Sequence, residues 1–260
     1  MFGACVTRVY QICGLYFVKI EFKLFNKLSW IILSSLILLL HLLYLSINLY
    51  FQYDFHYISF QYPDVLGAVT NFLQMMFPIV AHFVIILESF SKSMKTQKLV
   101  NKVYEIKNKL KLEIKFPFMK FLFLFLINSI IYVTLYAFVQ NYFWKFHLSF
   151  VMISVFLGNL FDFYYTCHVN FIEKTAICLQ CKLKQMFESG NRDLETLKLL
   201  KSTAADVWIL SEMINDRFAY SILSSTAFKL FHFVIDFYWI YIRIRLSLYD
   251  YYFPRNKNVL

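Results

Sequence analysis

The sequence predicts an all-α fold, a polytopic membrane helical bundle of about five transmembrane helices with cytoplasmic helical extensions. Of its 260 residues, 60% are hydrophobic and only 16% are charged, and the mean hydropathy is +0.55. Soluble domains carry about 25% charged residues, so this composition indicates an integral membrane protein. Glycine and proline are scarce, with 5 and 4 residues. This scarcity favours long helices, and no series of alternating segments of about ten residues indicates a β-barrel.

The apolar segments divide the chain into three regions. We expect a cytoplasmic N-terminus (1–28), a transmembrane helical domain (29–245) and a C-terminal tail (246–260). A helix needs about 20 predominantly apolar residues to cross the bilayer core, and five segments meet this length. The predicted spans are 29–51, 65–90, 116–138, 146–171 and 218–241.

Charge in the connecting segments predicts the orientation. The connection 52–64 contains Asp54 and Asp64 but no Lys or Arg, whereas 91–115 carries eight lysines against two glutamates. Because positively charged connections stay on the cytoplasmic side, we expect a membrane protein with its N-terminus in the cytoplasm. Apolar residues recur at helical spacing within 91–115, which predicts a basic amphipathic helix that binds anionic membrane lipid.

The basic C-terminal end conflicts with this orientation, because five spans place it outside. The residues concerned are Arg243, Arg245, Arg255 and Lys257. Two explanations remain open: the last stretch is not native sequence, or span five does not cross fully. The net charge of +10 lies in connections between apolar spans, so topology explains it. We expect no nucleic-acid partner, because no basic patch carries stacking aromatic residues on a soluble domain.

The segment 172–217 returns to helix-forming, charged sequence and predicts a cytoplasmic helical hairpin. Ser189-Gly190-Asn191 supplies its turn. Cys178 and Cys181 have the spacing of half a zinc site, but no second pair accompanies them. We therefore predict reduced thiols there, with no metal and no cofactor.

Several ionisable side chains fall within the predicted spans, where they are costly unless they face protein or water. His82 and Glu88 lie on span two, and we favour a hydrogen bond to a neighbouring helix over a ligand contact for each. Asp162 on span four needs a partner. One face of span five carries a polar row: Ser225, Lys229, His232, Asp236 and Arg243. A structural His232–Asp236 pair and the lining of a pocket or water path both remain open for this row.

The stretch 208–241 begins amphipathic and becomes almost wholly apolar after Arg217, which predicts one helix that enters the membrane without a break. It contains the pattern L-x4-N-x2-F-A-x3-L, formed by Leu210, Asn215, Phe218, Ala219 and Leu223. This pattern resembles the fifth membrane segment of the insect gustatory receptor family, seven-transmembrane insect chemoreceptors. The resemblance covers nearly the whole chain. The family's Thr-Tyr and Gln-Phe signature of the seventh segment is absent, so we expect a chain truncated after the fifth segment, in nature or in the gene model.

The resemblance implies a gustatory (taste) chemoreceptor, a subunit of a ligand-gated cation channel that binds small tastants. It also implies a homo- or hetero-tetramer with other gustatory receptor subunits, joined through cytoplasmic extensions. The pore of the family is lined by the seventh segment, so we expect no ligand-gated current from this chain alone. The family's ligand pocket opens outward between the outer halves of the helices. The corresponding residues here are Asn71, Gln74, Met75, Tyr132, Tyr136, Met152, His232 and Asp236.

The alternative is a transporter or another multi-pass protein with an ion path through His232, Asp236 and Asp162. Transporters often carry internal repeats and broken helices, and this chain shows neither beyond Pro78. We expect no enzyme, because the sequence contains no G-x-S-x-G, H-E-x-x-H, P-loop or G-x-G-x-x-G motif.

Overall fold

The computed structural model describes residues 10–11, 13–15, 27–59, 65–112, 142–189 and 193–252, with five isolated positions between 123 and 134. The helices are α2 (Lys27–Ser59), α3 (Val65–Ser91), α4 (Ser93–Leu110), α6 (Tyr142–Glu188) and α7 (Leu194–Tyr252). The predicted all-α class is confirmed. Most of predicted span three, with Tyr132 and Tyr136, lies outside the described residues.

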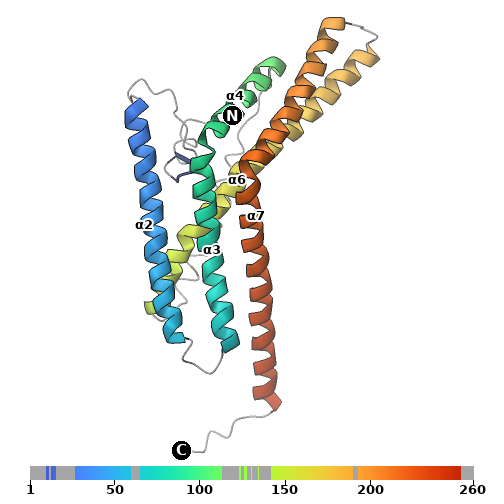
Figure 1. Cartoon of the computed structure of the whole chain (residues 1–260). Coiled ribbons are helices and arrows are strands. Elements are labelled where there is room, and N and C mark those ends of the chain that lie inside the picture. Colours follow the sequence, from blue (N-terminus) through green and yellow to red (C-terminus); the bar gives the residue numbers. More distant parts are fainter. Residues whose placement is uncertain are drawn as a thin grey trace, which may run out of the picture.

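The helix α3 is the centre of the bundle and contacts α2, α6 and α7. Figure 1 shows α2, α3 and the C-terminal part of α7 side by side, with α6 crossing them obliquely. At one end of the bundle, α4 continues from α3 and packs on α7. The hairpin formed by the end of α6 and the start of α7 projects from the same end (Figure 1). The two segments predicted to be cytoplasmic therefore lie together.

Three helices in the described part of the chain are long and apolar enough to cross a membrane. They contain the candidate spans Ile32–Phe51, Phe72–Ser91 and Leu194–Ile242. These correspond to predicted spans one, two and five. Span four (146–171) lies within α6, which is not one of the three, so its crossing of the membrane stays a prediction.

Two helices are longer than the sequence pattern predicted. The helix α2 continues past the expected end at Phe51 to Ser59, since no helix breaker precedes Pro63. Span four and the first arm of the hairpin form one uninterrupted helix, α6. As the predicted hairpin requires, α6 ends at Glu188 and α7 begins at Leu194, whereas Gly190 and Asn191 of the predicted turn lie outside the described residues. The helix α7 also confirms the prediction of one unbroken helix through Arg217.

Local hydrogen bonds define the helix ends at the hairpin side of the bundle. Lys111 adopts a left-handed conformation with φ of 52°, and the Leu112 amide donates to the Lys107 carbonyl at 3.0 Å, which closes α4. The Asp193 carboxylate accepts the Glu195 amide at 3.0 Å and caps the start of α7. These caps satisfy backbone groups that have no partner within their own helix.

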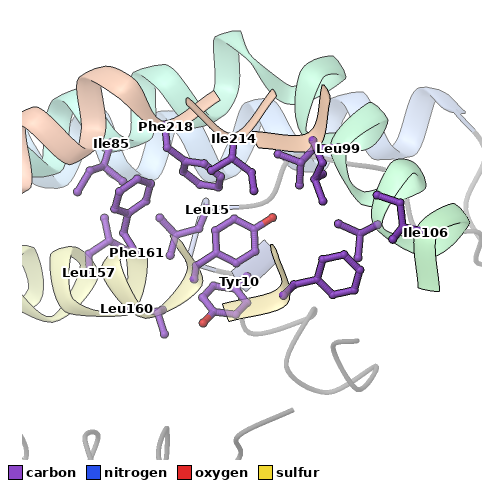
Figure 2. Packing of buried hydrophobic residues seen from close by; sticks show 14 of the residues in the cluster. Tyr10, Leu15, Ile85, Leu99, Ile106, Leu157, Leu160, Phe161, Ile214 and Phe218 are labelled. Atoms are coloured by element: carbon purple, nitrogen blue, oxygen red, sulfur yellow. The ribbon is translucent and has the colours of Figure 1, made fainter. Parts of the chain in front are cut away.

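The core lies where α3, α4, α6 and α7 meet, and Figure 2 shows it from close by. Ile85, Leu99, Phe161 and Phe218 are all fully buried in it, with no exposed area for Leu99 or Phe218. Tyr10 and Leu15 of the N-terminal segment also pack into this cluster. The core therefore joins the candidate membrane helices to the base of α4 and of the α6–α7 hairpin.

Candidate functional site

The helices α3 and α7 bring two of the predicted ligand-site residues together. Gln74 Nε2 donates a hydrogen bond to Asp236 Oδ1 at 3.4 Å. Nearby, the rings of Phe77 and Phe231 stack with centroids 4.1 Å apart and planes 13° apart. The residues come from segments far apart in the sequence, so only the packing of α3 on α7 creates this combination of a polar contact and an aromatic wall.

The remaining predicted residues have other positions. Met152 is half-buried on α6, and His232 packs edge-on against Phe228 with centroids 4.8 Å apart. His232 and Asp236 interact electrostatically, but no hydrogen bond or salt bridge joins their described side chains, so the predicted pair is present only as this weaker contact. Asn71 and Met75 lie on α3, but their side chains are outside the described part.

A buried polar cluster joins α2, α3 and α6 in the middle of the bundle. The His82 ring bonds His41 Nδ1 through its Nε2 at 3.0 Å and Ser154 Oγ through its Nδ1 at 3.0 Å. Tyr44 Oη lies 3.5 Å from Ser154 Oγ, and Asn48 Nδ2 donates to Tyr44 Oη at 3.2 Å. His82 and Asn48 have no exposed area. This confirms that His82 bonds neighbouring helices.

Sequence reasoning missed the contribution of span one to this cluster. Ser34, His41 and Asn48 recur every seven residues, which places them on one face of a helix. Their polar character within a Leu-rich span was a usable signal, because such residues face protein in a membrane. The structure confirms that Ser34 and Asn48 are buried.

A second buried polar network holds the junction of α3 and α4 against α7. The Glu88 carboxylate accepts the Ser221 backbone N–H at 2.8 Å, the Ser221 hydroxyl, and Lys92 Nζ at 2.6 Å. Arg217 is fully buried and donates to the hydroxyls of Ser89 and Thr96. The prediction that Glu88 bonds a neighbouring helix is confirmed.

This network supplies a physical reason for a bend in α7. Figure 1 shows α7 changing direction between its hairpin arm and its membrane arm. The helix contains neither Pro nor Gly. The Ser221 N–H would donate only to the carbonyl four residues earlier in a regular helix, but it also meets Glu88. A side chain inserted into the hydrogen-bond ladder is a recognised cause of a bend.

Asp162 on α6 finds its partners on the polar row of α7. Ser225 Oγ donates to its two carboxylate oxygens at 2.9 and 3.1 Å, and Lys229 forms a salt bridge with Oδ2. The prediction that Asp162 needs a partner is therefore confirmed. Lys229 and Ser225 were assigned to the right helix face, but the sequence did not show that α6 supplies the acid.

The basic helix α4 is amphipathic as predicted, and its apolar face includes Leu99 and Ile106. Three of its lysines are paired with α7, since Lys95 bonds the Asp216 carboxylate and Lys102 and Lys109 each bond the Asp206 carboxylate, all at 2.6 Å. The hydrogen bonds to Asp206 raise the pKa of Lys102 and Lys109 above the usual value. Part of the charge assigned to lipid binding thus holds α4 against α7.

The residues of the sequence motif serve the core only in part. Leu210 and Phe218 are fully buried, and the Phe218 ring lies 5.6 Å from that of Phe161. Asn215, Ala219 and Leu223 are exposed on α7. No group of three or more His, Cys, Asp or Glu that could hold a metal ion occurs in the described part of the chain.

Comparison with known families decides the identity. A family model described as "7tm Chemosensory receptor" matches residues 4–255. The chain belongs to the 7tm chemosensory receptor family. No curated protein and no solved structure matches it. Membership of the 7tm chemosensory receptor family makes this chain a multi-pass membrane receptor for small molecules, and not an enzyme. It also favours the chemoreceptor over the transporter hypothesis.

Proposed function

We propose that this chemosensory receptor chain is a gustatory subunit that binds a small tastant between the outer parts of α3, α6 and α7. The contact between Gln74 and Asp236, beside the stacked Phe77 and Phe231, carries this proposal. Aromatic walls with a few converging polar groups are typical of small-molecule sites. Asn71, Met75, Tyr132, Tyr136, Met152 and His232 complete the proposed lining.

The test measures tastant dose–response curves in cells that express the receptor with its natural co-subunits. Gln74→Ala, Asp236→Asn and Tyr136→Ala should each weaken the apparent affinity by roughly 0.5–3 kcal/mol while surface expression is kept. The control is Ser46→Ala, because within the described part of the chain the Ser46 hydroxyl bonds just the Leu42 carbonyl of its own helix, at 2.9 Å. Wild-type curves for all three variants would place the ligand elsewhere, and loss of surface expression would make these residues structural.

The proposed location is the plasma membrane, with the N-terminus, α4 and the α6–α7 hairpin in the cytoplasm. The presence of α4 and the hairpin at one end of the bundle supports this orientation, because α4 is strongly basic. A tag inserted near Asp54 should be labelled on intact cells, and a tag near Lys107 should be labelled only after permeabilisation. The reverse pattern would refute the orientation.

We also propose that the hairpin joins subunits into a homo- or hetero-tetramer. Phe187, Leu194 and Trp208 are 80%, 61% and 70% exposed on it, and exposed apolar surface of this kind favours a protein contact. Trp208→Glu should lower the mass of the complex purified in detergent, as measured by light scattering. Lys201→Glu changes a neighbouring exposed side chain and should leave the mass unchanged. Equal masses for both variants would argue against this interface.

A further inference from the structure

Two polar contacts lie on one face of α7. Lys229 and Asp236 are seven residues apart, which places them within about 20° of each other and about 10 Å apart along the helix. Lys229 pairs with Asp162 of α6, and Asp236 accepts a hydrogen bond from Gln74 of α3. The α7 face thus carries polar groups from its outer part to its middle.

These groups are accessible. The Lys229 side chain is 49% exposed and that of Asp162 is 28% exposed, and Asp236 is exposed as well. Leu223, Leu230 and Val234 are exposed too, but helical spacing places these three together on a different face of α7. The exposed surface of this helix is therefore divided into a polar strip and an apolar strip.

The two strips require different surroundings in a membrane. An ammonium and a carboxylate that face hydrocarbon cost several kcal/mol, so intramembrane charges face protein or water. Leu and Val side chains, by contrast, face lipid without an energetic penalty. The polar strip also borders the buried face of α7, where Ser225 contacts Asp162. The polar strip is therefore more stable beside a water-filled groove between α7 and its neighbours than against lipid.

We infer that the strip of α7 bearing Asp236 and Lys229 lines a water-filled groove that opens to the outside and ends at the Lys229–Asp162 pair. The ammonium has three N–H donors, and its salt bridge occupies one. The exposed remainder is available to a small anion, for which a sulfonate-bearing thiol reagent is the probe. Ser225 and Asp162 hold the lysine in place from the opposite side. The inference rests on the proposed orientation but needs no tastant.

Cysteine accessibility tests the groove without changing either charged residue. Phe233 and Val234 are at nearly equal depth on α7 and are 61% and 56% exposed, but only Phe233 borders the polar strip. Cells that express Phe233→Cys or Val234→Cys are treated from outside with membrane-impermeant methanethiosulfonates, one anionic (sulfonatoethyl) and one cationic (trimethylammonioethyl). Because the thiolate is the reacting species, a cysteine in water reacts rapidly and one in lipid does not. Phe233→Cys should react, and Val234→Cys should match the parental chain.

The charge of the pair is tested on the Phe233→Cys background. Lys229→Met should lower the ratio of anionic to cationic labelling rates roughly tenfold, and Asp162→Asn should raise it, because the remaining charge attracts the opposite reagent. A structural defect would not shift the ratio in opposite directions. Equal labelling of both cysteine variants, or ratios unchanged by both charge variants, would overturn the inference.

The sidedness of labelling separates this inference from the proposed function. Labelling of Phe233→Cys only from the cytoplasmic side of inside-out vesicles would overturn both the outward opening and the proposed orientation. Wild-type tastant responses of the Gln74 and Asp236 variants would refute the proposed ligand site, but labelling of Phe233→Cys from outside would still support the groove.

Discussion

Glu88 offers the sharpest test of how α3 is held against α7. Its side chain is 4% exposed, and its carboxylate is the acceptor for the Ser221 amide, the Ser221 hydroxyl and Lys92. Glu88→Ala removes all three interactions, whereas Glu88→Gln keeps the shape and one acceptor oxygen. The two variants therefore separate the loss of charge from the loss of the acceptor.

The magnitude follows from the burial of each donor. Ser221 is fully buried, so its groups lose their interhelical acceptor, and hydrogen bonds to charged groups contribute about 1.5–3 kcal/mol each. The Ser221 N–H retains the Arg217 carbonyl of its own helix, and Lys92, which is 17% exposed, keeps its bond to the Asp216 carbonyl. We therefore expect Glu88→Ala to lower the free energy of unfolding by about 3 kcal/mol, at the low end for a broken buried pair. Glu88→Gln should cost about 1 kcal/mol.

The measurement is unfolding of the purified chain in mixed micelles by increasing SDS, followed by fluorescence of its 4 tryptophans. Glu173→Ala is the matched control, because Glu173 is an exposed glutamate on α6 and should change the unfolding free energy by less than about 0.5 kcal/mol. A Ser221→Ala variant should show a coupling energy with Glu88→Ala of about 0.5–3 kcal/mol. If Glu88→Ala lowers the free energy of unfolding no more than the control does, or if its coupling energy with Ser221→Ala is zero, Glu88 does not hold α3 against α7.

Three further substitutions test other parts of the bundle in the same unfolding assay. Gly14→Ala should lower the free energy of unfolding by about 1–3 kcal/mol, because Gly14 has φ of +70° and an added Cβ would lie 2.9 Å from His41 Nε2. Its control is Gly158→Ala, whose Cβ would meet nothing within 4 Å and which should leave the free energy of unfolding unchanged. His82→Phe should lower the free energy of unfolding by about 1–3 kcal/mol, because it deprives His41 and Ser154 of their buried partner. An unchanged free energy of unfolding would argue against these buried hydrogen bonds. Asp206→Asn should speed amide exchange in α4 by an amount equivalent to about 1 kcal/mol, and this difference should shrink at about 1 M salt. An effect that is independent of salt would argue against the pairing of Asp206 with α4.

Local patterns predicted the elements of this fold well. The apolar runs of α2 and α3, the basic amphipathic α4 and the unbroken α7 all follow from length and periodicity, which neighbouring residues determine. The end of α2 was placed too early, because aspartate and aromatic residues after Phe51 indicated a connection. Without Gly or Pro in that stretch, the helix continues to Ser59.

Partners were harder to predict than elements. The spacing of His232 and Asp236 on one helix favoured a local pair, and the two do interact electrostatically, but the spacing did not show that Gln74 of α3 also bonds Asp236. His41 and Ser154 were not identified at all, although they satisfy His82. Each of these contacts joins residues from different helices, and spacing within a single helix contains no information about them.

The sequence by itself determined that this chain forms membrane helices with a basic amphipathic helix between two of them, because hydropathy, run length and charge act on each segment separately. It also showed which ionisable groups needed a partner. Only the tertiary structure decided that Asp162 pairs with Lys229 and that Glu88 meets Ser221. The physical reason is that the rotation of each helix about its axis and its crossing angle are set by side-chain packing against the other helices.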